Sequence, residues 1–140
     1  MKEEPHTLGF LLGRAAATMA TLLNQTLKSE GIDLPHSQFV ILRHLYNEDG
    51  ISQQELAERI FKDNAAIKRT LDNLEQKKLI QRVHVTQRKN SILITEEGKQ
   101  LLPQVLQSAE KAMRQILKDI SYEDYQHLRE MLEKIFRNTL

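Results

Sequence analysis

Apolar side chains recur along the first part of the chain at spacings of three and four residues, which is the period of an amphipathic α-helix. One such run extends over residues 7–29, and Gly31 follows it as a helix stop. A second helix is expected to open at Leu34-Pro35, because proline is tolerated in the first turn, and to end in the polar stretch 47–50. The N-terminal third is therefore predicted to be two helices joined by a short connection.

The middle of the chain predicts two shorter helices separated by a tight turn. Ser52-Gln53-Gln54-Glu55 has the capping-box pattern, in which the Ser hydroxyl and the Glu carboxylate each satisfy a free backbone N–H at a helix start. Phe61-Lys62-Asp63 forms the expected turn, and Asp63 is available to cap a helix over residues 64–77. The apolar positions of that second helix lie on one face, so its other face is left to solvent.

From Leu79 onward the period shortens to two, which is typical of β-strands. Residues 80–85 and 91–95 alternate in this way, and the polar residues 86–90 between them form the expected tip of a two-stranded ribbon. A long helix then carries apolar residues as far as Ile120, and Ser121 caps a last helix. The order of helix, turn, helix and ribbon is the layout of a winged helix-turn-helix.

The outer helices carry more apolar surface than one chain of 140 residues covers by itself, and intertwining two copies would bury it. We therefore expect a mostly α-helical fold with a small β-wing. Residues 35–98 form a winged helix-turn-helix, whereas residues 1–34 and 99–140 form a helical dimerisation region. The alternative is that the apolar stripes pack only within the monomer.

Composition narrows the class of protein. The chain has 40% hydrophobic and 28% charged residues with a mean hydropathy of −0.49, which predicts a soluble globular protein without a membrane span. The absence of cysteine excludes disulfides and thiolate metal sites, and it fits a cytoplasmic location. The apolar stretch 8–20 does not fit a secretory leader, because Glu3 and Glu4 precede it and Arg14 interrupts it.

Positive charge is concentrated in the middle of the chain. Residues 52–92 hold nine Lys and Arg against five Asp and Glu, a net charge of +4, whereas the remainder has a net charge of −3. A local positive patch is what a polyanion-binding face requires. The segment that contains the predicted winged helix-turn-helix is thus also the basic one.

The helix over residues 64–77 has the features of a helix that enters the DNA major groove. Ala65 and Ala66 allow close approach, Asn64 and Arg69 can contact base edges, and Lys68 can neutralise a phosphate. Arg88 at the ribbon tip suits a narrow minor groove. The full set of candidate DNA-contacting residues is Ser52, Gln53, Gln54, Asn64, Ala65, Ala66, Lys68, Arg69, Asn73, Arg88, Lys89 and Asn90.

Lys68 and Arg69 taken alone are more typical of a solvated helix face. Their combination with a capping box, a tight turn and a basic ribbon in this order favours DNA binding over that interpretation. The main alternative function is a winged-helix module that docks onto another protein. A docking module has no reason to place cations on both groove-facing elements, so Arg88 together with the Lys68-Arg69 pair favours DNA.

The chain resembles the MarR family of bacterial transcription regulators over nearly its whole length. The wing of that family has the pattern D-x-R-x-x-x-(V/I)-x-(L/I)-T-x-x-G, and Arg88, Ile92, Ile94, Thr95 and Gly98 stand at the matching spacings. Residues 52–59 are similar to the third helix of the family, and residues 65–69 fall where its recognition helix usually reads S-T-V-T-R. Thr86 stands in place of the family Asp, and Lys78 stands in place of a common Gly.

The resemblance implies a homodimer on a pseudo-palindromic site of double-stranded DNA, with a repressor as the more frequent role. It also implies that a small aromatic or anionic effector binds between the dimer helices and the DNA lobe and lowers DNA affinity. Arg14, His36, Phe39 and Arg43 could line such a crevice, with the cations meeting a carboxylate. The alternative is that these four residues are ordinary surface and interface side chains, and the sequence favours this alternative.

Metal and enzyme functions are not expected. The five histidines form no H-x-x-x-H pair and no carboxylate set of familiar ligand spacing, so no metal site or other cofactor is predicted. The chain also has no Gly-rich phosphate loop and no G-x-S-x-G motif. Transcription regulation by DNA binding, and not catalysis, is the function that the sequence predicts.

Overall fold

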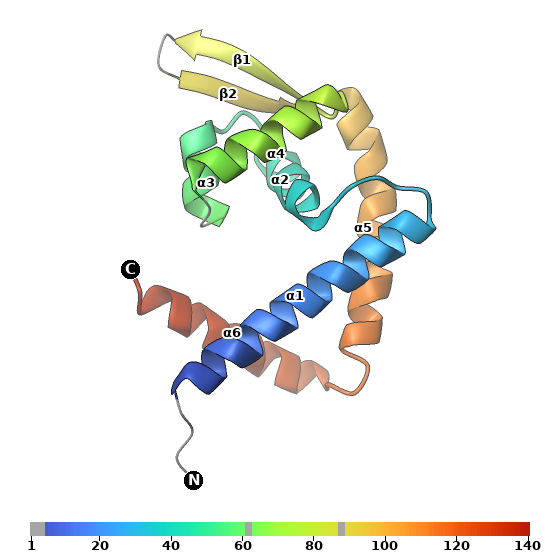
Figure 1. Ribbon diagram of the computed structural model, residues 1–140, viewed down its shortest axis with the longest axis vertical. Helices are drawn as coiled ribbons and strands as arrows, with labels where there is room; N and C mark the ends of the chain where they lie inside the picture. The colour runs from blue at the N-terminus through green and yellow to red at the C-terminus, as the bar shows by residue number, and fades with distance from the viewer. Residues whose placement is uncertain (1–4, 61–62, 87–88) are drawn as a thin grey trace.

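The computed structural model describes residues 5–60, 63–86 and 89–140, and it describes their side chains except those of residues 5, 6, 85, 86 and 89. Within these ranges the chain forms six helices and one two-stranded sheet (Figure 1). The elements in order are α1 (Pro5–Ser29), α2 (His36–Asn47), α3 (Gln53–Ile60), α4 (Asn64–Gln76), β1 (Ile80–Thr86), β2 (Lys89–Ile94), α5 (Glu96–Ile116) and α6 (Tyr122–Arg137). The predicted fold class, mostly helical with a small β-wing, is confirmed.

Three predicted helix starts are confirmed by side-chain caps. The Ser52 hydroxyl accepts a hydrogen bond from the Glu55 backbone N–H at 3.1 Å. Asp63 accepts one from the Ala66 N–H at 2.8 Å, and Ser121 accepts one from the Asp124 N–H at 3.1 Å. Each bond satisfies a backbone donor that has no partner inside its helix, so local sequence alone fixes where α3, α4 and α6 begin.

The hydrophobic core joins α2, α3, α4 and the wing to the C-terminal half of α1 and the first half of α5. Leucine and isoleucine side chains from the inner faces of α1 to α5 and from the wing make up most of it. The fully buried members include Leu27, Leu42, Leu45, Leu56, Ile67, Leu71, Leu74, Ile92, Leu102 and Val105. Because α4 is held by Ile67, Leu71 and Leu74 on one side only, its opposite side remains at the surface.

The wing is an antiparallel ribbon with a register that runs from Ile80 opposite Ile94 to Thr86 opposite Lys89. Pairing therefore continues further toward the tip than the sequence suggested, with an irregularity in register between His84 and Thr86. A segment before α3 also pairs with β2, because Gly50 donates to the Ile92 carbonyl and Ile92 donates to the Ile51 carbonyl. This third line of backbone bonds ties the start of α3 to the wing.

The C-terminal helices differ in one respect from the expectation. The long helix α5 ends at Ile116, and Ile120 lies in the turn that follows, where its N–H donates to the Leu117 carbonyl. The local cause is the cap at Leu117, whose N–H still bonds to Met113 but whose backbone has left the helical region. The last helix, α6, contains no buried residue in the described chain.

Lys78, between α4 and the wing, has a positive backbone φ of 63°, the left-handed conformation that favours glycine. Lys78→Gly is therefore expected to raise the free energy of unfolding by about 1 kcal/mol, because glycine adopts this conformation without steric strain. Urea unfolding monitored by circular dichroism measures the change.

Lys78→Ala is the matched control, since alanine removes the same charge but keeps the strained Cβ. It is expected to leave the free energy of unfolding within about 0.5 kcal/mol of the parent. An equal gain in both variants would show that the charge of Lys78, and not its backbone conformation, is the source of the effect.

Candidate nucleic-acid interface

The outer face of α4 presents the predicted recognition residues to solvent. Asn64, Ala65, Lys68, Arg69 and Asn73 are all exposed, and Ala66 is half-buried. The Asp63 cap sets the first turn of the helix, and the buried leucine face fixes its rotation about its own axis. The structure thus brings six of the predicted residues together on one side of a single, well-supported helix.

Lys68 and Arg69 remain available for a polyanion. Within the described part of the chain neither side chain forms an ion pair, whereas three other cations of the basic segment do. Arg59 bonds to Glu48, Arg82 bonds to Asp72 and Glu75, and Lys77 contacts Asp33. The excess charge counted along the sequence is therefore partly neutralised inside the fold, and the uncompensated part includes Lys68 and Arg69.

Arg82 connects the stem of the wing to the recognition helix. Its guanidinium donates to the Glu75 carboxylate at 3.1 and 3.3 Å and also to Asp72. The hydrogen bonds from Arg82 lower the pKa of Glu75, so the pair stays ionised well below neutral pH. These bonds connect the stem of the wing in β1 to the C-terminal half of α4.

Arg59 forms a similar ion pair, which connects α3 to the end of α2. It donates to both oxygens of Glu48, at 2.5 and 3.1 Å, and so joins the end of α3 to the end of α2. Hydrogen bonding to Arg59 lowers the pKa of Glu48. The pKa of nearby His44 is also lowered, first by burial and then by the positive charges of Arg59 and Arg43, which favours its neutral form.

A polar groove of about 770 Å³ lies between α3, the start of α4 and strand β2. It is lined by Ser52, Gln53, Gln54, Glu55, Glu58, Asn64 and Asn90. Five of the predicted contact residues therefore line one groove, namely Ser52, Gln53, Gln54, Asn64 and Asn90. Ser52 is only 9% exposed and its hydroxyl is used in the helix cap, so its role in the structure is support for α3.

The predicted contacts at the wing tip are described only in part. Arg88 lies outside the described residues, as does the Phe61-Lys62 part of the predicted turn. Lys89 is the first residue of β2, and its backbone pairs with Thr86. Asn90 is the next residue and pairs with His84. Strand β1 of the ribbon packs against α4.

The four predicted effector residues do not share one cavity within the chain. His36 lines a cavity of about 260 Å³ between α2, α3 and α4, with Ile60, Ile67 and Thr70 among its other walls. Phe39 is 6% exposed and belongs to the hydrophobic core, because it lies on the inner face of α2. Arg43 and Arg14 are exposed, and the Arg14 guanidinium lies 5.1 Å from the centre of the Phe10 ring.

The described residues offer neither a cluster of metal ligands nor a membrane-spanning helix. No group of three or more His, Cys, Asp or Glu side chains gathers there in an arrangement that could hold a metal ion. None of the helices in this part of the chain is long and apolar enough to cross a membrane.

Comparison with known proteins places the chain among regulators. A sequence model of the MarR family matches residues 34–88. The curated relative YybA of Bacillus subtilis (strain 168), an uncharacterized HTH-type transcriptional regulator, is 26% identical over 129 residues, which cover 91% of this chain and 85% of YybA. The residues matched by the family model include α2, α3, α4 and β1, and the match ends before β2.

Solved structures extend the similarity to the whole fold. A mutant of MarR from E. coli, complexed with operator DNA, is 23% identical and superposes with a TM-score of 0.84, covering 92% of this chain and 93% of that one. CouR from Rhodococcus jostii RHA1, bound to p-coumaroyl-CoA, is 26% identical with a TM-score of 0.80, covering 91% and 90% of the two chains. The described fold is thus that of winged-helix MarR structures.

Proposed function

We propose that the chain is a DNA-binding transcription regulator of the MarR family, which binds a pseudo-palindromic operator as a homodimer and represses transcription there. The observation that carries the proposal is the outer face of α4, where Lys68 and Arg69 are exposed and form no ion pair within the described chain. The curated relatives are named as transcriptional regulators, which favours regulation over catalysis.

In the proposed complex α4 lies in the major groove of each half-site. Ala65 and Ala66 allow the helix to approach the bases, Asn64 and Arg69 contact base edges, and Lys68 contacts a phosphate. Gln53, Gln54 and Asn73 flank this contact. Arg88, Lys89 and Asn90 of the wing then reach the adjacent minor groove, at a spacing that the Arg82 bonds to α4 maintain.

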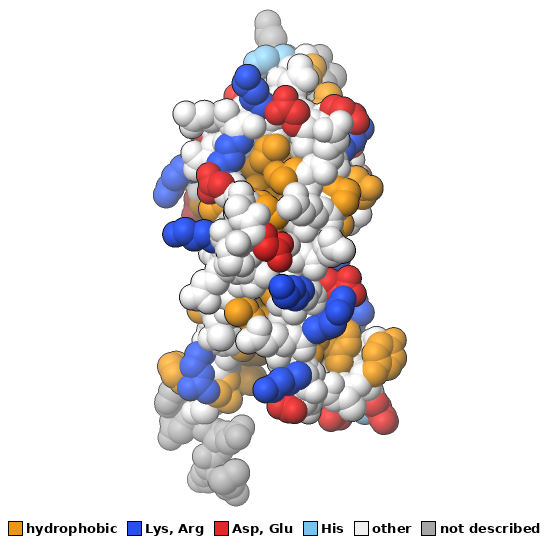
Figure 2. Space-filling model, turned by 90° about the vertical axis from the view of Figure 1, so that its right-hand side faces the viewer, with side chains coloured by type: hydrophobic (Ala, Val, Ile, Leu, Met, Phe, Trp, Pro, Cys, Tyr) orange, Lys and Arg blue, Asp and Glu red, His pale blue; other side chains and the backbone are white. Residues whose placement is uncertain are grey.

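The dimer is proposed from the apolar side chains that the single chain leaves in solvent. Leu128, Met131, Leu132, Ile135 and Phe136 of α6 are between 38% and 55% exposed. Leu8, Phe10 and Leu11 of α1 are exposed as well, and hydrophobic side chains reach the surface at this lower end of the molecule (Figure 2). Apolar side chains that gather on an exposed face mark an interface between proteins. A second copy of α1 and α6 would cover this one.

Of the four residues that the sequence predicted to line an effector crevice, only His36 lines a cavity between α2, α3 and α4. CouR is described bound to p-coumaroyl-CoA, which is an aromatic and anionic ligand. For this chain we propose that a small aromatic or anionic effector binds near the His36 cavity of about 260 Å³, where the walls come from α2, α3 and α4. To change DNA affinity, the effector must bind the DNA-bound and free conformations of the protein with different affinities.

The proposed cellular location is the cytoplasm, because a protein that acts at an operator must reach the DNA.

Selection of bound sites from a random duplex library, followed by titration at several salt concentrations, tests the DNA proposal. We expect an inverted repeat with half-sites about one helical turn apart and a steep loss of affinity with salt. No enriched motif, or weak binding that ignores salt, would contradict the proposal and favour the protein-docking alternative.

Leu132→Asp tests the dimer, because it places a charge on the apolar face of α6 without entering the core. Its oligomeric state is measured by sedimentation, and its affinity for the inverted repeat is measured by titration. This variant is expected to sediment as a monomer and to lose most of its affinity for the inverted repeat. His127→Asp is the matched control, because it introduces the same negative charge at an exposed position of α6 outside the apolar set. Dimeric Leu132→Asp with full affinity would show that α6 is not the interface.

A further inference from the structure

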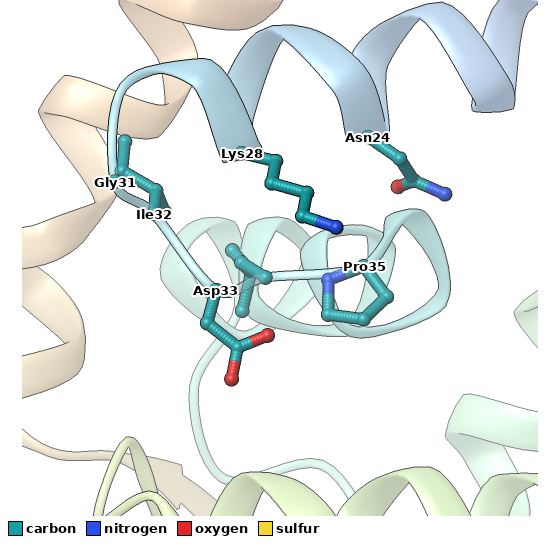
Figure 3. Close-up of a pocket in the computed structure, with 7 residues that line it drawn as sticks. Asn24, Lys28, Gly31, Ile32, Asp33 and Pro35 are labelled. Atoms are coloured by element: carbon teal, nitrogen blue, oxygen red, sulfur yellow. The ribbon is translucent and has the colours of Figure 1, made fainter.

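The connection from α1 to α2 is held against α1 at both of its ends. At its beginning the Ile32 N–H donates to the Leu27 carbonyl at 2.9 Å, and the Ile32 side chain is buried. At its end the Asn24 side-chain carbonyl accepts the His36 backbone N–H at 2.7 Å, so α1 also holds the first turn of α2. Residues 33–35 lie between these two attachments (Figure 3). The backbone of the connection therefore keeps a defined position relative to α1.

The ammonium of Lys77, at the C-terminal end of α4, bonds to this connection. It donates to the Asp33 backbone carbonyl at 2.8 Å and to the side-chain carbonyl of Gln38 in α2 at 2.7 Å. The Asp33 carboxylate points away from Lys28 and Asn24 of α1 and lies 3.4 Å from the same ammonium (Figure 3). Three oxygen atoms on two segments thus contact one ammonium group.

The two carbonyl bonds carry most of this attachment. Gln38 is 6% exposed and the Lys77 side chain is 27% exposed, so water competes little for the bond between them. A hydrogen bond from a charged donor to a shielded acceptor is among the stronger polar contacts, and removal of the donor would deprive a buried oxygen of this partner. The Asp33 side chain is 88% exposed, so its ion pair with Lys77 adds little.

The other end of the Lys77 residue belongs to α4. Its backbone N–H still bonds to the Asn73 carbonyl at 3.1 Å, so the residue caps the helix. Arg82 of β1 joins the same half of α4 to the wing through Asp72 and Glu75. The recognition helix and the stem of the wing are therefore linked to each other, and Lys77 attaches both to the segment that α1 holds.

We propose that Lys77 is a positioning residue for operator recognition. Its bonds to Asp33 and Gln38 fix the orientation of α4 relative to α1 and thereby restrict the spacing between half-sites that the dimer accepts. The inference rests on the proposed function, because it requires a dimer formed by α1 and α6 with one α4 in each half-site. In such a dimer the separation of the two recognition helices depends on how each DNA-binding lobe is attached to α1.

The test uses duplexes in which the selected half-sites keep their sequence but are moved closer together or further apart by one or two base pairs. Fluorescence anisotropy with the full chain gives the affinity for each spacing. The parent is expected to bind the altered spacings at least about tenfold more weakly, because its lobes reorient only when a hydrogen bond from a charged group breaks. Lys77→Met keeps the aliphatic stem but removes the ammonium. In this variant the difference between spacings should largely disappear, whereas the base preference within each half-site should not change.

Three further variants separate the contacts of Lys77. Gln38→Met removes the buried acceptor at nearly constant volume and should relax the spacing preference in the same direction as Lys77→Met. Asp33→Asn removes only the exposed ion pair and keeps the backbone carbonyl, so it should retain most of the preference. Lys118→Met makes the same substitution at an exposed position between α5 and α6 and should bind every spacing like the parent.

A folded, dimeric Lys77→Met that discriminates between spacings as the parent does would overturn the inference. An equal loss of affinity at every spacing would overturn it as well, because Lys77 would then support the lobe without orienting it. If Lys77→Met does not fold, an unchanged spacing preference in Gln38→Met has the same meaning. A parent that selects no inverted repeat would instead refute the proposed function, and the inference with it.

Discussion

Gly98→Ala is expected to lower the free energy of unfolding by about 3 kcal/mol, the upper end of the usual range for overpacking. A Cβ atom at this position would lie 2.5 Å from the Leu79 carbonyl oxygen and 2.8 Å from Ile94 Cγ1. The carbonyl cannot move freely, because it accepts the Thr95 N–H at 3.0 Å. The added methyl group must therefore push α5 away from the base of the wing.

Urea unfolding of the parent and of Gly98→Ala measures this effect. Lys99→Ala is the matched control, because it introduces alanine at the next position of α5, where the side chain is exposed, and it should change the free energy by at most about 0.5 kcal/mol. The folded fraction of Gly98→Ala should also bind the operator less tightly, since the wing is displaced relative to α4. A stability equal to that of the parent would show that α5 tolerates the methyl group.

Thr95 explains why the base of the wing is so tightly packed. Its hydroxyl donates to the Lys78 carbonyl at 2.7 Å and accepts the Gly98 N–H at 3.1 Å. One side chain thus caps α5 and holds Lys78, the left-handed residue that follows α4 and its cap. The sequence indicated Thr95 and Gly98 through their spacing in the wing pattern, but the reason for that spacing is a contact between segments that no local signal encodes.

Features that depend on neighbouring residues were predicted well from the sequence. The caps at Ser52, Asp63 and Ser121 act over three residues, and the change to a period of two marked the wing. The extra backbone pairing of Gly50 and Ile51 with Ile92 was not predicted, because it joins positions that are about forty residues apart. Short-range chemistry thus located the elements but not all the bonds between them.

At the candidate site, too, the sequence predicted local features of the side chains but not their contacts with distant segments. Lys68 and Arg69 were predicted as contacts and are exposed, because helical periodicity decides which face of α4 is buried. The ion pairs of Arg82 and Lys77 were missed, since sequence counts charges without showing which of them meet. Phe39 was predicted to line an effector crevice, but it lies on the inner face of α2 and belongs to the hydrophobic core.

Arg69→Ala is expected to weaken binding to the selected operator by about 10- to 100-fold, the value of one good base contact, with a much smaller effect on random DNA. The fold should not change, because Arg69 is exposed and forms no ion pair in the described chain. Site selection repeated with this variant should show relaxed preference at one position of each half-site. Fluorescence anisotropy with the selected and scrambled duplexes gives the two affinities.

Lys68→Ala provides the contrast that separates base recognition from charge neutralisation. It should weaken the selected and scrambled duplexes about equally and reduce the slope of affinity against salt by about one unit, since one phosphate contact is lost. The two residues are neighbours on α4, but the 100° turn between them directs one side chain at the bases and the other at the backbone. If Arg69→Ala instead showed the uniform loss and the reduced salt slope, Arg69 would be the phosphate contact, and α4 would be rotated in the groove relative to the proposed complex.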